Sequence, residues 1–402
     1  MTRRRGFLIG GTGACAAWLL PLGLEEAPPR RRRRGTVGDI GGATVPLATV
    51  SLADFGGLPG AGRAVLAEAF SQAFADLAWR GGGTLLVPAG MYDFGDVTDS
   101  AYLVLCRNLR NIAISAYGAT FMATTSARVV PNMFYFFNFH NVTLAGASFI
   151  DRGFNPCVDW KGMYCVGIQA DKPSSGLRLV DCYAERVIGL LGSNNNASSR
   201  WYLSDISVQG EVRYAYYGVA ARFIRHAVNV DLVCHNVRRA LIGFSLRDAD
   251  IVVTASSSSN WPGSNGLISL ATNGSSTGNV ENVRLHVTVS GACIHRCYVH
   301  FYHVGPEVQG YMRDIDATVH IVTPNSSGTL FLFDHEIDRV QAKTTRTWDR
   351  ISLHGTVADR FKGKIVSNPS MTTSPGTVFL DRKLANIGKR TVLAANFRIK
   401  PS

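Results

Sequence analysis

Hydrophobic and polar residues alternate in a short phrase that returns along most of this chain. Each copy has Asn or Asp, then Val or Ile, then any residue, then Leu, Ile or Val. Such alternation, with β-branched residues at apolar positions, is typical of a half-buried β-strand. Recurrence every ~30 residues predicts a β-solenoid whose stacked coils share one core. The clear copies begin at Asn111, Asn141, Asp205, Asn229, Asp250 and Asn282, and looser copies surround Leu177, Ile315 and Ile351.

The segments between copies show no helical periodicity of useful length, which excludes βαβ folds. The polar residue that opens each phrase suits a turn, because Asn and Asp tolerate left-handed backbone and bond to their own main chain. We therefore expect these residues to stack as a ladder. The chain length predicts an all-β solenoid of about ten to eleven coils, on the order of 50 Å long at the spacing of paired strands.

One segment, Ala64 to Arg80, has convincing helical periodicity. Gly81-Gly82-Gly83 ends it, and an apolar strand follows at once. We expect this helix to cap the N-terminal end of the solenoid and to turn one apolar side toward the core. The residues on that side are Val65, Leu66, Ala69, Phe70, Phe74, Leu77 and Ala78.

The N-terminus, with Arg4-Arg5-Gly6-Phe7-Leu8-Ile9 before a weakly apolar stretch, resembles a twin-arginine export signal. This predicts an exported protein, periplasmic or secreted. The apolar stretch is short and glycine-rich for a membrane span, so membrane contact is expected only through an uncleaved N-terminal segment. The predicted organisation is a signal and basic linker (1–34), a lead-in segment (35–62) and a β-helix domain (63–402).

The net charge of +12 is unevenly distributed, because residues 1–34 contain eight Arg and two Glu. The remaining chain is only mildly basic, which suits either an acidic ligand, such as a uronic-acid polymer, or an ordinary solvated surface. A nucleic-acid partner is not expected.

Seven cysteines remain beyond the signal, and an odd number argues against a full disulfide framework. Cys157 with Cys165 and Cys293 with Cys297 are spaced to close small loops, and buried thiols are the alternative. No CxxC pair is present, so zinc-site spacing is absent.

Several motifs in residues 50–150 resemble the opening of the pectate-lyase-like superfamily. They are Ala53-Asp54-Phe55-Gly56, the capping helix, Gly82-Gly83-Thr84, Pro88-Ala89-Gly90-Met91-Tyr92 and Ala116-Tyr117-Gly118-Ala119-Thr120-Phe121. The resemblance implies a single-stranded right-handed parallel β-helix in a carbohydrate-active group of lyases, hydrolases, epimerases and phage depolymerases. A polysaccharide partner and a possible homotrimer are likewise implied.

The sharper signatures of that superfamily are missing. The polygalacturonase elements Asn-Thr-Asp, Asp-Asp and Gly-His-Gly do not occur, nor does the Asp-Pro-His of mannuronan epimerases. The sequence also lacks the calcium-binding Asp cluster of pectate lyases, so neither a metal nor another cofactor is expected.

Charged residues follow several of the phrases at similar phase, and four carboxylates are the catalytic candidates: Asp151, Asp159, Glu185 and Glu211. If Glu185 and Glu211 occupy equivalent positions on adjacent coils, they lie about 5 Å apart along the axis, and Asp151 lies near 10 Å from Glu211. Retaining glycosidases need carboxyl groups about 5 to 5.5 Å apart and inverting ones about 6.5 to 9.5 Å. The sequence is therefore compatible with either a retaining or an inverting glycosidase.

The candidates for binding substrate are cationic or aromatic: Arg152, Arg186, Arg213, Tyr216, Arg238, Arg239, Trp261, His295, His300 and Tyr302. By phase, Tyr217 and Phe301 are expected in the core, as is the aromatic run from Met133 to Phe139. The preferred function is hydrolysis of a polysaccharide by these carboxylates. The alternatives are β-elimination on a uronate polymer, with Arg and Tyr or His as catalytic groups, and a non-catalytic glycan-binding or structural rod.

Overall fold

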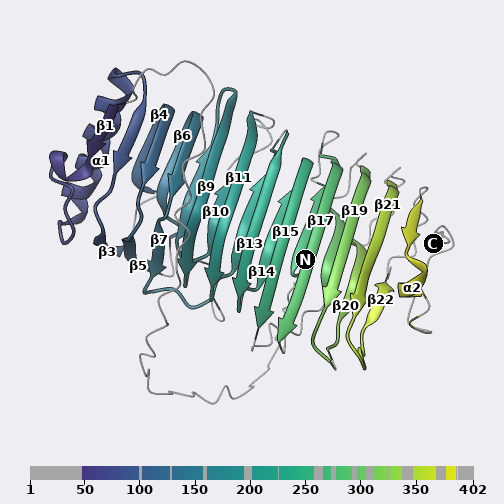
Figure 1. Cartoon of the computed structure of the whole chain (residues 1–402). Helices are drawn as coiled ribbons and strands as arrows, with labels where there is room; N and C mark the ends of the chain where they lie inside the picture. The colour runs from purple at the N-terminus through teal and green to yellow at the C-terminus, as the bar shows by residue number, and fades with distance from the viewer. Residues whose placement is uncertain are drawn as a thin grey trace, which may run out of the picture. The chain divides into compact units, whose positions relative to one another are not determined.

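In the computed structural model the chain is a right-handed parallel β-helix, which confirms the predicted fold class. The structure describes residues 48–98, 102–126, 129–156, 161–193, 202–224, 226–257, 266–272, 278–291, 297–304, 311–324, 326–336, 347–367, 377–385 and 387. Strands of successive coils lie side by side from α1 to α2 (Arg382–Ala385), as Figure 1 shows. Among the described residues, none of the helices has the length and apolarity needed to cross a membrane.

Two runs of parallel strands form the coils. The long-strand sheet contains β1 (Ala48–Ser51), β2 (Gly83–Leu86), β4 (Tyr102–Ser115), β6 (Asn132–Ala145), β9 (Ser174–Glu185), β11 (Leu203–Arg213), β13 (Val228–His235), β15 (Arg247–Ser257), β17 (Val280–Gly291), β19 (Tyr311–Ile321), β21 (Thr347–Val357) and β23 (Val378–Leu380). The short-strand sheet begins with the first halves of β4 and β6. It continues through β8 (Tyr164–Gln169), β10 (Gly189–Ser193), β12 (Tyr217–Arg222), β14 (Arg239–Phe244), β16 (Ile268–Thr272), β18 (Cys297–Val304), β20 (Thr329–Glu336) and β22 (Lys364–Ser367).

A third, shorter run consists of β3 (Gly90–Val97), β5 (Ala119–Thr125) and β7 (Ser148–Asp151). It joins the long-strand sheet where β7 pairs with the end of β9. Each coil contributes one long strand and, in most coils, one short strand, which agrees with the predicted number of about ten to eleven coils. The lead-in segment already takes part in the fold, because β1 pairs with β2.

The polar residue at the start of the phrase has a left-handed backbone in four of the six clear copies: Asn111, Asn141, Asp205 and Asn282. The Asn141 amide donates to Asn111 Oδ1 at 3.1 Å, so the expected ladder is present there. The prediction was wrong for Asn229 and Asp250, which lie two residues beyond the true turn residues Ala227 and Asp248. A strand pattern of period two looks the same after a shift of two residues, so alternation alone did not fix the register.

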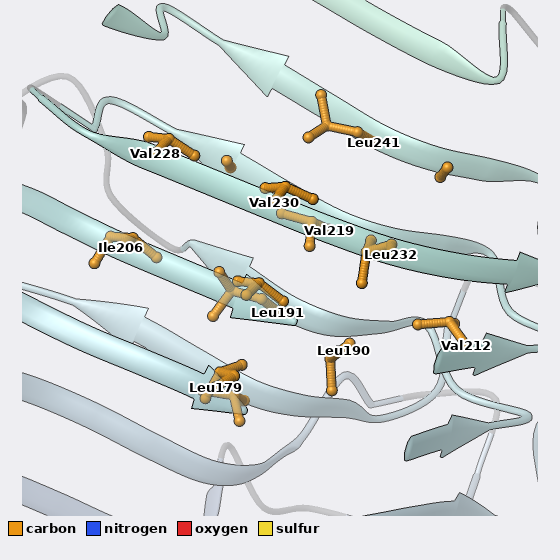
Figure 2. Packing of buried hydrophobic residues seen from close by; sticks show 14 of the residues in the cluster. Leu179, Leu190, Leu191, Ile206, Val212, Val219, Val228, Val230, Leu232 and Leu241 are labelled. Carbon is orange, nitrogen blue, oxygen red and sulfur yellow. The ribbon is translucent and has the colours of Figure 1, made fainter. Parts of the chain in front are cut away.

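Aliphatic side chains from both sheets fill the interior. Figure 2 shows Leu179, Ile206 and Val230 of the long-strand sheet near Val219 and Leu241 of the short-strand sheet, and all are buried. Because paired strands are parallel and in register, like residues stack from coil to coil. This repetition produces one continuous core.

The aromatic run of β6 divides between the core and the outer surface. Phe134, Phe136 and Phe139 are buried as expected, whereas Tyr135 and Phe137 point outward, where their rings stack with centroids 6.5 Å apart. Alternation along a strand explains the division, since successive side chains point to opposite faces.

Helix α1 (Arg63–Trp79) packs against the first coils and buries Leu66, Phe70 and Leu77, which confirms the predicted cap. Val65 and Ala78 were wrongly placed on its apolar side and are exposed. Gly83, at φ +150°, follows the helix. A Cβ there would lie 2.2 Å from the Ala48 carbonyl oxygen, so only glycine permits this close pairing of β1 and β2.

The described cysteines Cys106, Cys165, Cys182, Cys234 and Cys297 are all buried. Their burial favours the alternative of core thiols for Cys165 and Cys297. Cys157 and Cys293 lie outside the described residues. Burial raises the pKa of the Cys182 thiol to about 12, so this thiol stays protonated and unreactive at neutral pH.

A second ladder crosses the turns between the short and long strands, and it gives a stability prediction. Asn138, at φ 55°, donates to Asp171 Oδ1 at 2.7 Å and accepts from the Asp171 backbone at 3.0 Å. We expect Asn138→Ala to lower the free energy of unfolding by about 2 kcal/mol, because the two hydrogen bonds with Asp171 and the one donated to Asn108 Oδ1 are lost and Ala disfavours left-handed backbone. Asn138→Gly removes the same side chain without that backbone penalty. Urea unfolding should therefore show a higher free energy of unfolding for Asn138→Gly than for Asn138→Ala. The reverse order would contradict the ladder interpretation.

Candidate functional site

Five ionisable side chains gather on the outer face of the long-strand sheet where β9, β11 and β13 end. They form what we call the carboxylate cluster: Tyr183, Glu185, Glu211, Arg213 and His235. Their positions follow from strand register, because Tyr183 pairs with Glu211, and Glu185, Arg213 and His235 stand in one row across the strands. Alternating residues of each strand point to the same side, so all five share the outer face.

Hydrogen bonds and ion pairs connect the members of the cluster. Arg213 Nε donates to Glu211 Oε1 at 2.6 Å, and His235 Nε2 lies 3.6 Å from the same oxygen. The Tyr183 hydroxyl donates to Glu185 Oε2 at 2.6 Å, and the Arg213 guanidinium lies over the Tyr183 ring at 5.9 Å. The Glu211 side chain is 24% exposed and that of Glu185 29%, so both carboxylates remain accessible from solvent.

Two pKa shifts accompany this packing. Burial raises the pKa of Tyr183, and the hydrogen bond and charge of Glu185 raise it further. The phenol therefore remains a hydrogen-bond donor at neutral pH. The hydrogen bond and charge of Glu211 raise the pKa of Arg213 against the opposing effect of burial. This guanidinium is a fixed positive charge beside Glu211.

The structure corrects the expected equivalence of Glu185 and Glu211. Glu185 pairs with Arg213, not with Glu211, so the two glutamates are diagonal neighbours. Between Leu179 and Cys182, β9 has one residue more than β11, which is a β-bulge, and the register after the bulge brings Glu185 opposite Arg213 and onto the same face as Glu211. Strand spacing places their Cα atoms about 8 Å apart rather than the expected 5 Å.

Asp151 does not belong to the cluster. Its carboxylate is fully buried at the end of β7 and accepts hydrogen bonds from the Thr125 amide and hydroxyl and from the amides of Gly153 and Met163, at 2.5 to 3.1 Å. Burial raises the pKa of Asp151, and these hydrogen bonds oppose the shift. With all four acceptor sites occupied, Asp151 holds the chain after β7 in place and is not available to a substrate.

The remaining expected residues near the turns are dispersed. Arg152 forms an exposed ion pair with Asp93 at 2.8 Å, on the third run of strands. Arg186, which has left-handed backbone, lies 3.9 Å from Glu185 at the border of the carboxylate cluster. Asp159, Trp261 and His295 lie outside the described residues.

A second group of side chains lies on the short-strand sheet, beyond the turns that follow β11 and β13. We call it the arginine–tyrosine patch: Tyr164, Tyr216, Tyr217, Arg222, Arg238 and Arg239. Arg238 lies over the Tyr216 ring at 4.6 Å and Arg239 over the Tyr217 ring at 5.9 Å, and the two rings are 4.7 Å apart. The structure thus brings the expected binding residues Tyr216, Arg238 and Arg239 together.

Burial raises the pKa of both Tyr164 and Tyr217, although neighbouring arginines oppose it. Tyr217 was wrongly expected in the core, since it points outward against Arg239. A patch of three guanidinium groups beside tyrosine rings suits planar, anionic or hydroxyl-rich ligands.

His300 and Tyr302 of β18 also point outward but are each only 5% exposed. Their rings stack at 4.6 Å, and His300 Nε2 lies 4.0 Å from Asp334 Oδ2. Phe301, between them, packs in the core against Phe333, as predicted. The low exposure of His300 and Tyr302 does not favour direct contact with a polymer.

Sequence reasoning did not single out Tyr183, His235 or Arg222. The signal for His235 was present, because alternation along β13 puts His235 on the outer side of the strand. Once Val228 is aligned with Ile206, His235 falls in the same row as Arg213. Tyr183 is found by the same alternation, two residues before Glu185 on the outer face.

Within the described part of the chain, no group of three or more His, Cys, Asp or Glu side chains converges as a metal site.

Comparisons with known proteins add little to this geometry. No family model matches the chain, and no curated protein matches it. Solved structures do match. The mannuronan C-5 epimerase AlgE6 A-module of Azotobacter vinelandii is 11% identical, over 87% of this chain and 97% of the module, with a TM-score of 0.42. The surface adhesin PfbA of Streptococcus pneumoniae is 11% identical over 80% and 92%, with a TM-score of 0.42.

A third match is an endo-xylogalacturonan hydrolase from Aspergillus tubingensis, which is 13% identical over 88% of this chain and all of that one, with a TM-score of 0.35. At such identities and TM-scores these matches carry no argument about activity. The assignment of the fold rests on the parallel strand pairing of the chain itself.

Proposed function

We propose that this protein binds a polysaccharide and hydrolyses it at the carboxylate cluster, with Glu185 and Glu211 as the two catalytic carboxylates. The observation that carries the proposal is the gathering of two accessible carboxylates, an arginine, a tyrosine and a histidine on one outer face. Glycoside hydrolysis needs a proton donor and a second carboxylate that activates water or attacks the sugar.

The two glutamates have different surroundings, which suggests different roles. Glu211 is paired with Arg213 and serves as the ionised carboxylate. Glu185 carries no ion pair as close as that of Glu211, since the nearest guanidinium atom, Arg186 Nε, lies 3.9 Å away, so we assign it the proton transfer to the leaving group. With Cα atoms about 8 Å apart, side-chain rotation places the carboxyl groups at either the retaining or the inverting separation.

The arginine–tyrosine patch supports substrate binding. It lies only a short turn beyond the carboxylate cluster along the chain, because Tyr216 follows Arg213 and Arg238 follows His235 within three residues. Guanidinium groups stacked on tyrosine rings suit the hydroxyl or carboxylate groups of a sugar, and the rings present apolar faces.

A lyase is the second candidate, and the tyrosines of the arginine–tyrosine patch do not favour it. β-Elimination needs a base beside the arginine that neutralises the uronate. Burial raises the pKa values of Tyr164 and Tyr217, which keeps these phenols protonated. The patch therefore offers hydrogen-bond donors rather than the required base.

The test is incubation of the purified protein with a panel of acidic and neutral polysaccharides, while reducing ends and unsaturated-uronate absorbance are followed together. We expect new reducing ends without absorbance. Both signals together would replace hydrolysis by elimination. Binding of a polymer without either signal would identify the protein as a non-catalytic glycan-binding rod.

A further inference from the structure

Two histidines from neighbouring strands lie side by side on the outer face of the long-strand sheet. The register pairs His286 of β17 with Thr318 of β19, and Thr288 with His320, so the histidines are diagonal neighbours. Their ring centroids are 5.0 Å apart, and the ring planes are inclined by 52°. His286 is exposed and His320 half-buried, so the space beside the rings is reachable from solvent.

This spacing is the one that a shared metal ion requires. Imidazole nitrogens bind zinc at about 2.0–2.1 Å, and two rings bound to one tetrahedral ion have centroids about 5 Å apart. Imidazole is also a preferred ligand of copper and nickel. The pair is therefore arranged for a divalent transition metal without a large movement of either side chain.

The surroundings of the pair favour a cation. His320 Nδ1 lies 2.9 Å from Thr356 Oγ1, and this contact orients the ring while leaving Nε2 for a ligand. Asp316 stands two residues before Thr318 on the same face, and its carboxylate lies 3.6 Å from His354 Nε2 of β21. The nearest guanidinium on β17, that of Arg284, is paired with Asp250 at 2.8 Å.

We propose that His286 and His320 together bind one divalent transition-metal cation, with water in the remaining coordination positions. The site is separate from the proposed catalytic one. His320 and Glu211 stand in the same row of the sheet, but Val233, Thr254 and Thr288 of three intervening strands separate them. A bound cation would link β17 to β19 and so join two successive coils.

The test is calorimetric titration of the purified full chain, without a polyhistidine tag and after removal of metals by a chelator, with zinc chloride. We expect saturable binding and a rise in the midpoint of thermal unfolding when zinc is added, since a ligand of the native state stabilises it. His286→Ala and His320→Ala should each weaken zinc binding at least about tenfold, because each removes one of two protein ligands.

His140→Ala is the matched control. His140 is exposed and contacts the Ser175 hydroxyl of the neighbouring strand at 3.1 Å, as His320 contacts Thr356, but its register partners are Arg110 and Ser175 rather than a histidine or a threonine next to one. Its replacement should leave zinc binding unchanged. The proposal is overturned if the chain shows no saturable binding, if both His286→Ala and His320→Ala bind zinc like the wild type, or if His140→Ala loses as much affinity as they do.

Discussion

Replacing Asp151 with Ala should lower the free energy of unfolding by about 4 kcal/mol, because three backbone amides and one hydroxyl would lose their acceptor inside the protein. Asp151→Asn should cost about half as much. Its oxygen can still accept from the Thr125 and Gly153 amides, but its NH₂ group would face the Met163 amide, which is also a donor. Urea unfolding followed by circular dichroism measures both changes. If unfolding is irreversible, the variants are compared by their unfolding rates instead of by their free energies of unfolding.

Arg152→Ala is the control for this experiment. It removes the neighbouring ion pair with Asp93, in which both side chains are more than a third exposed, and should cost less than about 1 kcal/mol. Asp151→Ala unfolding at the same urea concentration as Arg152→Ala would show that the carboxylate does not anchor the chain. Loss of turnover in a stable Asp151→Asn protein would instead restore Asp151 as a catalytic candidate.

The strand phrase predicted the fold because every coil of a β-helix repeats the same pattern of buried and exposed strand positions. Each coil must bury the same apolar positions, so Ile112, Val142 and Ile206 occur where the stack requires them. The capping helix was predictable for a similar reason, since the end of a stack exposes core that must be covered. Register was less predictable. At β13, Val228, Val230 and Leu232 are all buried, so a shift of two residues satisfies the same pattern.

The candidate site was predictable only in part, because it depends on register across strands. The bulge between β9 and β11 moves Glu185 opposite Arg213, and neither strand shows this in its own sequence. Asp151 illustrates a different failure. Its charge suggested chemistry, but its partners Thr125 and Met163 come from separate segments, and only their convergence shows a buried carboxylate with every acceptor site used.

Glu211→Gln should lower kcat for polysaccharide hydrolysis at least about a thousandfold and change KM little, because glutamine cannot act as a base or a nucleophile but keeps the size of the side chain. Glu185→Gln should also reduce kcat strongly, since it removes the proposed proton donor. These rates are measured with the polymer that the substrate panel identifies, by release of reducing ends.

Glu281→Gln provides a control with nearly the same local structure. Glu281 accepts from the Tyr311 hydroxyl at 3.0 Å and from Arg313 Nε at 2.8 Å, with Arg313 lying over the Tyr311 ring at 4.3 Å. Its side chain is 24% exposed, as is that of Glu211. Because both substitutions remove a carboxylate paired with arginine, their thermal midpoints should fall by similar amounts. Only Glu211→Gln should lose turnover. Equal loss of activity in Glu281→Gln would mean that a tyrosine–glutamate–arginine group stabilises the coils in general. The carboxylate cluster would then not be the catalytic site.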